Sequence, residues 1–294
     1  MHNDTQMNRR GFALTSLASG FALAVQPVAA STIATSSDGL IAGEVKIPTA
    51  GGQMPAYRAV LSGVQNAPVI LVVHEIFGVH EWIKDICRRF AKAGFMAVAP
   101  DLFARAGDAT KYTDIRKLID EIVLKTPDDQ VHADLDATAS WAAGEGGNTK
   151  QLSVTGFCWG GRVTWLYAAH NPNIKAGVAW YGTLVKRGTD PRPVHPIDVA
   201  DKIDGRVIGL YAQDDPGIPL DSVEAMRAAL RKAGDKQSDI LVYNGAKHGF
   251  LADYRPSFNQ AAAVAGWNKA LEWLHARGAA GSATLKRPQP VPAQ

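Results

Sequence analysis

The sequence predicts an α/β fold in which a mostly parallel central sheet is flanked by helices on both faces. The continuous apolar run at 69–74 is typical of a central strand that is buried on both sides. Segments with the pattern of short strands also alternate along the chain with segments of helical spacing, which favours parallel strands joined by helices. A third observation is the stretch 151–167, which reads as a strand, a tight turn and a helix. In such sheets, sites lie at the carboxyl ends of the strands.

The other elements follow in the same alternating order. Two extended patterns on either side of Gly51 and Gly52 predict a hairpin at an edge of the sheet. The proline-rich stretch 186–204 is predicted to be a long surface loop. Strands are expected at 41–48, 54–61, 69–74, 95–99, 152–155, 176–181, 207–211 and 240–243, and helices at 82–93, twice within 115–143, and at 162–170, 221–233 and 261–276.

The first thirty residues have the composition of a bacterial export signal. Arg9 and Arg10 precede an apolar run, and small residues follow up to Ala30, after which we expect cleavage. The arginine pair followed by Phe12 resembles a twin-arginine leader, with a general secretory signal or a membrane anchor as the alternatives. The run is short and broken by Gly20, which disfavours a spanning helix and stable membrane insertion. We therefore expect a periplasmic protein.

The rest of the chain has the length of one large domain. We expect residues 1–30 to be the export signal, 31–39 a linker, 40–277 the folded domain, and 278–294 a disordered, proline-rich tail.

Charge and cysteine content exclude several classes of protein. The formal net charge is only +3 and no dense basic stripe occurs, so nucleic acid is not an expected partner. Two cysteines are too few for a disulfide scaffold, and Cys87 falls in a helical pattern as a core residue would. The stretch HEIFGVH at 74–80 lacks the HExxH spacing of a zinc site, and no dinucleotide fingerprint follows a strand. We expect a monomer without metal or cofactor that acts on a small molecule.

Cys158 stands at the turn of the strand–turn–helix stretch, in the sequence GFCWGG. A nucleophile elbow holds its central residue in strained geometry, and small residues two positions away on each side let strand and helix approach. Gly156 and Gly160 occupy those positions. The amino end of a helix favours a thiolate, and the N–H of Trp159 would face an oxyanion. The alternative is a buried cysteine in a glycine-rich turn.

A base and an acid for this nucleophile are expected later in the chain. His248 follows the strand at 240–243, and both Asp214 and Asp215 follow the strand at 207–211. All three leave the same edge of the sheet as Cys158, so His248 is the candidate general base and either aspartate could orient it. Three other histidines lie in poorer places for this role: His170, His195 and His275.

The sequence resembles the dienelactone hydrolase family (carboxymethylenebutenolidases) of the α/β-hydrolase superfamily over nearly all of residues 40–277. The motifs that carry the resemblance are HEIFG at 74–78, PDLFAR at 100–105, GFCWGG at 156–161, GLYAQDDPGIP at 209–219 and KHGF at 247–250. The resemblance implies an α/β-hydrolase fold and hydrolysis of a small ester or lactone, such as an enol lactone.

The resemblance also implies a role for each matching residue. Asp215 matches the family's acid because it lies four residues before Pro219, and Asp214 is the fallback. The implied roles are Cys158 as nucleophile, His248 as base, Glu75 in thiol activation, the N–H groups of Ile76 and Trp159 as oxyanion hole, and Arg105 in binding a substrate carboxylate.

One position departs from the family pattern. Where a second carboxylate-binding arginine is expected, four residues after His248, the chain has Ala252, and Arg255 nearby is the possible substitute. Dienelactone itself is therefore an uncertain substrate. The expected chemistry is a Cys-His-Asp triad acting through an acyl-thioester. A broad carboxylesterase or thioesterase, or a ligand-binding protein without turnover, are the alternatives.

Overall fold

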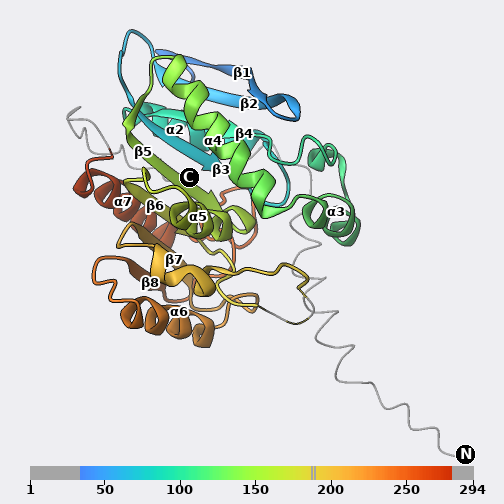
Figure 1. Cartoon of the computed structure of the whole chain (residues 1–294), viewed down its shortest axis with the longest axis vertical. Helices are drawn as coiled ribbons and strands as arrows, with labels where there is room; N and C mark the ends of the chain where they lie inside the picture. The colour runs from blue at the N-terminus through green and yellow to red at the C-terminus, as the bar shows by residue number, and fades with distance from the viewer. Residues whose placement is uncertain (1–33, 187, 189, 280–294) are drawn as a thin grey trace, which may run out of the picture.

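The computed structural model describes residues 34–186, 188 and 190–279, and Figure 1 shows their arrangement. They form one eight-stranded sheet with the order β1-β2-β4-β3-β5-β6-β7-β8. β2 pairs antiparallel with β1 and with β4, and all other neighbours in the sheet are parallel. The predicted mostly parallel sheet and the hairpin at its edge are therefore confirmed. The strands are β1 (Leu40–Thr49), β2 (Gly52–Leu61), β3 (Pro68–Val73), β4 (Met96–Pro100), β5 (Asn148–Phe157), β6 (Ala176–Trp180), β7 (Val207–Ala212) and β8 (Asp239–Tyr243).

Helices cover both faces of the sheet. In Figure 1, α4 and α5 lie in front of the strands, where an ion pair between Arg162 and Asp128 joins them. On the opposite face α2 and α7 meet through the rings of Phe90 and Trp267, whose centroids are 4.7 Å apart. The strands β3, β4, β6 and β7 are consequently buried along their whole length, as their apolar sequences require, and β5 is buried from Leu152 onward. The α-helices are α2 (Glu81–Lys92), α3 (Ile115–Glu121), α4 (Asp128–Gly144), α5 (Trp159–His170), α6 (Leu220–Lys232) and α7 (Gln260–Ala276).

The stretch 186–204 is not simply a surface loop. It contains a 3₁₀ helix, η4 (Pro196–Lys202), and His195 directly before it is buried. The guanidinium of Arg162, on α5, donates a hydrogen bond to the carbonyl of Val194, 2.6 Å away. The prediction missed the 3₁₀ helix and the buried His195, because proline content indicates an irregular backbone but does not show that a distant arginine will hold it against a helix.

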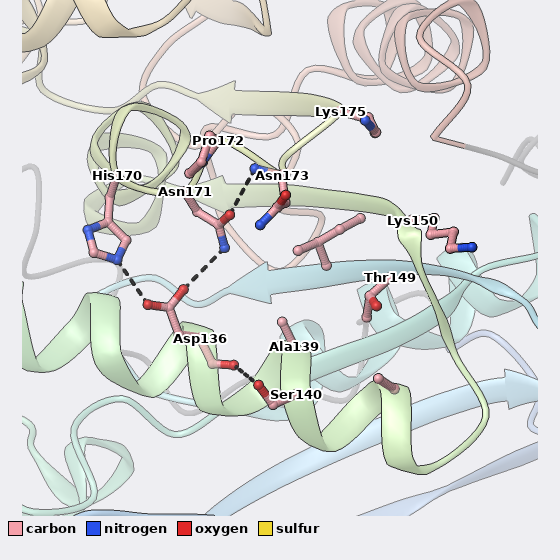
Figure 2. Close-up of a pocket in the computed structure, with 12 residues that line it drawn as sticks. Asp136, Ala139, Ser140, Thr149, Lys150, His170, Asn171, Pro172, Asn173 and Lys175 are labelled. Carbon is pink, nitrogen blue, oxygen red and sulfur yellow. Dashed lines mark hydrogen bonds and ion pairs between the residues drawn. The ribbon is translucent and has the colours of Figure 1, made fainter.

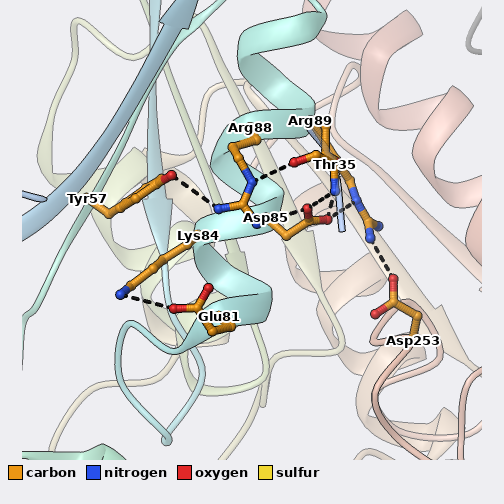
Figure 3. A network of polar contacts seen from close by, with 8 residues as sticks. All are labelled: Thr35, Tyr57, Glu81, Lys84, Asp85, Arg88, Arg89 and Asp253. Atoms are coloured by element: carbon orange, nitrogen blue, oxygen red, sulfur yellow. Dashed lines mark hydrogen bonds and ion pairs between the residues drawn. The ribbon is translucent and has the colours of Figure 1, made fainter. Parts of the chain in front are cut away.

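A network of polar contacts on α2 joins both ends of the domain (Figure 3). The backbone N–H and the hydroxyl of Thr35 donate to Asp85, and Arg88 donates to the carbonyl of Thr35. Arg89 contacts Asp85 and also Asp253, which lies in the loop after β8. Residues 34–39, expected as part of a linker, thus begin against α2, and the same helix anchors the loop that carries Tyr254 and Arg255.

The proposed export signal at 1–30 lies outside the described residues, as does most of the predicted tail. Gly278 and Ala279, its first two residues, cap α7: the N–H of Ala279 donates to the carbonyl of Leu274, and Ala279 is buried. Among the described residues, none of the helices combines the length and the apolar composition that a membrane span requires.

Candidate active site

The turn at Cys158 has the strained geometry that the sequence predicts. β5 ends at Phe157 and α5 begins at Trp159, and Cys158 between them has φ 55° and ψ −114°. A Cβ on Gly156 would lie 2.1 Å from the carbonyl oxygen of Gly160. One on Gly160 would lie 2.4 Å from that of Val73. Only glycine fits at either position, and the half-buried thiol is left projecting from the edge of the sheet.

His248 and Asp215 meet beside this turn. The Nδ1 of His248 lies 2.7 Å from Oδ2 of Asp215, although the two residues follow different strands, β8 and β7. The other carboxylate oxygen, Oδ1, accepts the N–H of Gly217 at 2.8 Å, which fixes its orientation. Asp214 is exposed, and its N–H donates to the carbonyl of Ala246. Of the two aspartates that the sequence offered, Asp215 is therefore the one in contact with the imidazole.

Charge couples His248 to both of its neighbours. Burial by itself lowers the pKa of His248, but the negative charges of Asp215 and Cys158, with hydrogen bonds to both, raise it to about 10. Burial likewise raises the pKa of Asp215, and the opposing charge of His248 brings it below its ordinary value. Since Nδ1 faces Asp215, Nε2 is the ring nitrogen that remains for proton exchange with Cys158. The arrangement can move a proton between sulfur and imidazole while the carboxylate stays ionised.

Glu75 is fully buried and its two oxygens have protein partners. Oε1 accepts from Arg255 at 2.8 Å, and Oε2 accepts from the hydroxyl of Tyr254 at 2.5 Å, with His80 at 3.5 Å. Burial raises the pKa of Glu75, but the charge of Arg255 and the other contacts lower it to about 2. The carboxylate that the family resemblance assigned to thiol activation is thus held by an arginine and a tyrosine from the loop after β8.

The sequence left open whether Arg255 substitutes for the arginine that is missing at Ala252, and the structure shows where its side chain lies. Its side chain points inward and is only 4 % exposed, while Ala252, at the position of the missing arginine, is buried. Neither Tyr254 nor the inward orientation of Arg255 could be read from local sequence. The available clue was the buried glutamate in HEIFG, because a buried carboxylate needs a cationic partner.

Arg105 is engaged in a different contact from the one expected. Its guanidinium forms two hydrogen bonds with Asp134 of α4, at 2.5 and 2.7 Å, and one with the hydroxyl of Thr49 at 2.9 Å. Asp134 is almost fully buried, so this planar two-bond pair is well fixed. The structure therefore places Arg105 against a helix and a hairpin turn, with its charge already balanced.

The two proposed oxyanion donors come from segments that His74 contacts or adjoins. Ile76 follows β3 and Trp159 is the first residue of α5, where helix N–H groups lack helical partners. The His74 Nδ1 bonds to the carbonyl of Glu75, its Nε2 accepts from the N–H of Leu102, and its ring stacks on Trp159. Burial lowers the pKa of His74 to about 4. This neutral histidine joins three segments and is not a candidate base.

Two hollows in the described part of the molecule lie at the opposite edge of the sheet. Figure 2 shows the larger, of about 1080 Å³, between the end of α4, the start of β5 and the segment after α5. There Asp136 bonds to His170 and Asn171. The second, of about 550 Å³, lies between Ile174, Arg206 and Trp273. Neither of these two is lined by Cys158, His248 or Asp215.

A parallel sheet with a thiol at a strained strand–helix turn, and a histidine–aspartate pair after later strands, is the arrangement of the α/β-hydrolases. A model of the dienelactone hydrolase family matches residues 54–277. The chain therefore belongs to the dienelactone hydrolase family and is a carboxylic-ester hydrolase.

Relatives and solved structures agree with this assignment. A Methylorubrum extorquens protein named "Putative carboxymethylenebutenolidase" is 54% identical over 94% of this chain and 95% of its own length. One of the same name from Escherichia coli K12 is 49% identical over 90% and 97%. The crystal structure of a "Putative Dienelactone Hydrolase" from Klebsiella pneumoniae has a TM-score of 0.78 at 51% identity, covering 80% of this chain and 98% of that one. A cold-adapted esterase from an Arctic intertidal metagenomic library shares the fold alone, with a TM-score of 0.61 at 16% identity over 83% and 96%.

Proposed function

We propose that this hydrolase cleaves small esters or lactones through a Cys158–His248–Asp215 triad and an acyl-thioester intermediate. The observation that carries the proposal is the 2.7 Å contact between His248 and Asp215, with the imidazole also coupled by charge to Cys158 at the strained turn. Each of the three groups follows a different strand at one edge of the sheet.

Acylation begins with transfer of the thiol proton to Nε2 of His248. The sulfur then forms a bond to the acyl carbon, and the carbonyl electron pair moves onto oxygen, where the N–H groups of Ile76 and Trp159 stabilise it. When this intermediate collapses, the bond to the leaving oxygen breaks and His248 returns its proton to that oxygen. Asp215 keeps the imidazole in the tautomer that this exchange requires.

Deacylation uses the same groups in reverse order. Water gives a proton to His248 and adds as hydroxide to the thioester carbonyl. The carbon–sulfur bond breaks, its electron pair stays on sulfur, and the carboxylic acid leaves. His248 then returns its proton to the sulfur, which restores the thiol. Because thioesters deacylate slowly unless the substrate assists, the thiol favours activated substrates such as enol lactones.

Two other functions fit the same fold. A broad carboxylesterase or thioesterase would use the same triad on many acyl groups, and a ligand-binding protein would bind without turnover. Assays of the purified protein with p-nitrophenyl acetate and an enol lactone separate the three. Turnover of the enol lactone alone supports the first function, turnover of both supports the broad esterase, and binding without hydrolysis supports the third. A Cys158→Ser variant with full activity would contradict the thiol mechanism.

We also propose that the protein is exported to the periplasm by the twin-arginine route and acts there as a monomer. The support for export is the composition of residues 1–30, with Arg9 and Arg10 before an apolar run. Replacing both arginines by lysine should keep the precursor in the cytoplasmic fraction, and unchanged export would contradict this route. Size-exclusion chromatography of the exported protein tests the monomer.

A further inference from the structure

Tyr181 occupies the position beside Cys158 in the neighbouring strand. Phe157 and Trp180 are the last paired residues of β5 and β6, and the N–H of Cys158 donates to the carbonyl of Trp180 at 3.0 Å. The next residue of each strand is therefore Cys158 on one and Tyr181 on the other. Both have left-handed backbones, with φ 55° and φ 38°, which few non-glycine residues adopt.

The strain at Tyr181 arises from the close contact between the end of β6 and α5. A Cβ on Gly182 would lie 2.2 Å from the backbone nitrogen of Arg162, and one on Gly161 would lie 2.4 Å from the carbonyl oxygen of Trp180. The chain must bend sharply where Tyr181 stands in order to pass the first turn of the helix. Strained residues of this kind persist where the surrounding structure fixes them, and they are frequent at functional sites.

The hydroxyl of Tyr181 is buried and has no hydrogen-bond partner within the ranges that the structure describes. Its ring meets the ring of His248 edge to face, with centroids 5.1 Å apart, and that of Phe250 at 5.4 Å. Leaving a buried hydroxyl without a partner is unfavourable, so such a group in a native protein calls for a functional explanation. The contact of its ring with His248, and its position next to Cys158 on the neighbouring strand, suggest such a function.

The surroundings keep this hydroxyl protonated. Burial, followed by the charge of Glu75, raises the pKa of Tyr181 well above its ordinary value, and the charge of Cys158 acts in the same direction while Arg255 opposes them. A phenol in this state donates a hydrogen bond and does not ionise at neutral pH. It would gain a partner as soon as negative charge developed on a neighbouring atom.

We propose that the Tyr181 hydroxyl donates a hydrogen bond to the Cys158 thiolate once it has formed, an inference that rests on the proposed function. The S–H bond breaks, its proton passes to Nε2 of His248, and the electron pair stays on sulfur. Tyr181 keeps its own proton throughout and adds a neutral donor to the imidazolium. The other charged group that acts at this sulfur is Arg255, and its charge is offset by Glu75, which Tyr254 also contacts.

The test is the pH dependence of Cys158 alkylation by iodoacetamide in the full chain, read by mass spectrometry of the Cys158 peptide. Peptide readout excludes Cys87, which is fully buried. In Tyr181→Phe, we expect the pH of half-maximal alkylation rate to rise by about one unit, which is a tenfold change in thiolate population. The melting temperature should not fall, because the lost hydroxyl has no partner. The matched control is Tyr167→Phe. Tyr167 lies toward the far end of α5, and its hydroxyl donates to Asp136 of α4. This variant should lower the melting temperature and leave the alkylation profile unchanged.

Each outcome has one meaning. An alkylation profile in Tyr181→Phe that matches wild type overturns this inference while leaving the triad intact. A fall in melting temperature as large as that of Tyr167→Phe would also overturn it, since it would show that the protein already satisfies the hydroxyl. A wild-type Cys158 that reacts only at strongly alkaline pH would contradict the proposed function itself.

Discussion

The two edges of the sheet differ in backbone strain, in burial and in the coupling of charged groups. The amino edge, where β5 and β6 begin, has the larger of the two hollows described above, with a volume of about 1080 Å³. The carboxyl edge is the opposite one, where the strands end beside Cys158. The acidic group of the amino edge, Asp136, is well supplied with partners, His170, Asn171 and Tyr167. The carboxyl edge has two non-glycine residues with positive φ, Cys158 and Tyr181, and a coupled thiol, imidazole and carboxylate.

Backbone strain and charge coupling thus distinguish the carboxyl edge from the amino edge, whereas the presence of a hollow does not identify the reactive groups. At the amino edge, the carboxylate of Asp136 has hydrogen-bonding partners in Tyr167, His170 and Asn171. Groups at the carboxyl edge are buried, and their protonation depends on one another. Perturbed titration together with backbone strain is the usual physical signature of an active site. The comparison therefore predicts that equivalent substitutions at the two edges will have very different effects.

The largest difference is expected between Cys158→Ala and Ser140→Ala. The first removes the proposed nucleophile and should lower kcat/KM for p-nitrophenyl acetate by about ten-thousandfold. The second removes a hydroxyl at the amino-edge hollow, which donates to the carbonyl of Asp136, and should leave kcat/KM unchanged. Similar kcat/KM values for the two variants would contradict the assignment of the reactive groups to the carboxyl edge.

The next effect distinguishes Asp215 from Asp214. Asp215→Asn should lower kcat by about a hundredfold to ten-thousandfold, because an amide cannot hold the imidazole in the required tautomer. Asp214→Asn changes an exposed side chain and should alter kcat less than twofold. The reverse order of the two losses in steady-state kinetics would show that the wrong aspartate has been assigned.

Stability should also differ between the two edges. Glu75→Gln leaves the charge of Arg255 buried without its partner and should cost about 3–5 kcal/mol of unfolding free energy. Because the folded pKa of Glu75 lies below its ordinary value, near 2, this contribution is present above pH 4.5 and is lost as the pH falls toward 2. The difference between wild type and variant in urea unfolding should shrink over that window. For comparison, Asp136→Asn at the amino edge should cost less than about 1 kcal/mol. Equal losses of unfolding free energy in the two variants would mean that burial of the Glu75–Arg255 pair does not make it more important for stability than an exposed pair.

A smaller effect concerns substrate charge. Asp134→Asn should weaken the hold on Arg105 and raise the ratio of kcat/KM for p-nitrophenyl hemisuccinate to that for p-nitrophenyl butyrate by about threefold. Asp129→Asn, which changes an exposed carboxylate on the same helix, is the control. If the wild type already prefers the anionic ester and Asp134→Asn does not alter the ratio, the pairing of Arg105 with Asp134 does not limit substrate binding.

The parts of this account that the sequence predicted are those specified locally. The elbow follows from Gly156, Cys158 and Gly160, because close approach of strand and helix needs small residues at fixed spacing. The positions of His248 and Asp215 follow from strand ends in a parallel sheet. What could not be predicted depends on contacts between distant segments: the balance of Arg105 by Asp134, and the inward turn of Arg255 toward Glu75. The position of Tyr181 beside Cys158 required the register of β5 and β6.

The most direct test of the central claim is to trap the acyl group on the enzyme. Wild-type protein mixed with p-nitrophenyl acetate and quenched in acid within milliseconds should carry one acetyl group on the peptide that contains Cys158, and hydroxylamine at neutral pH should release it as expected of a thioester. Turnover of the ester with the acetyl group on another residue, or with no covalent acyl group at any quench time while deacylation is slower than acylation, would contradict the account.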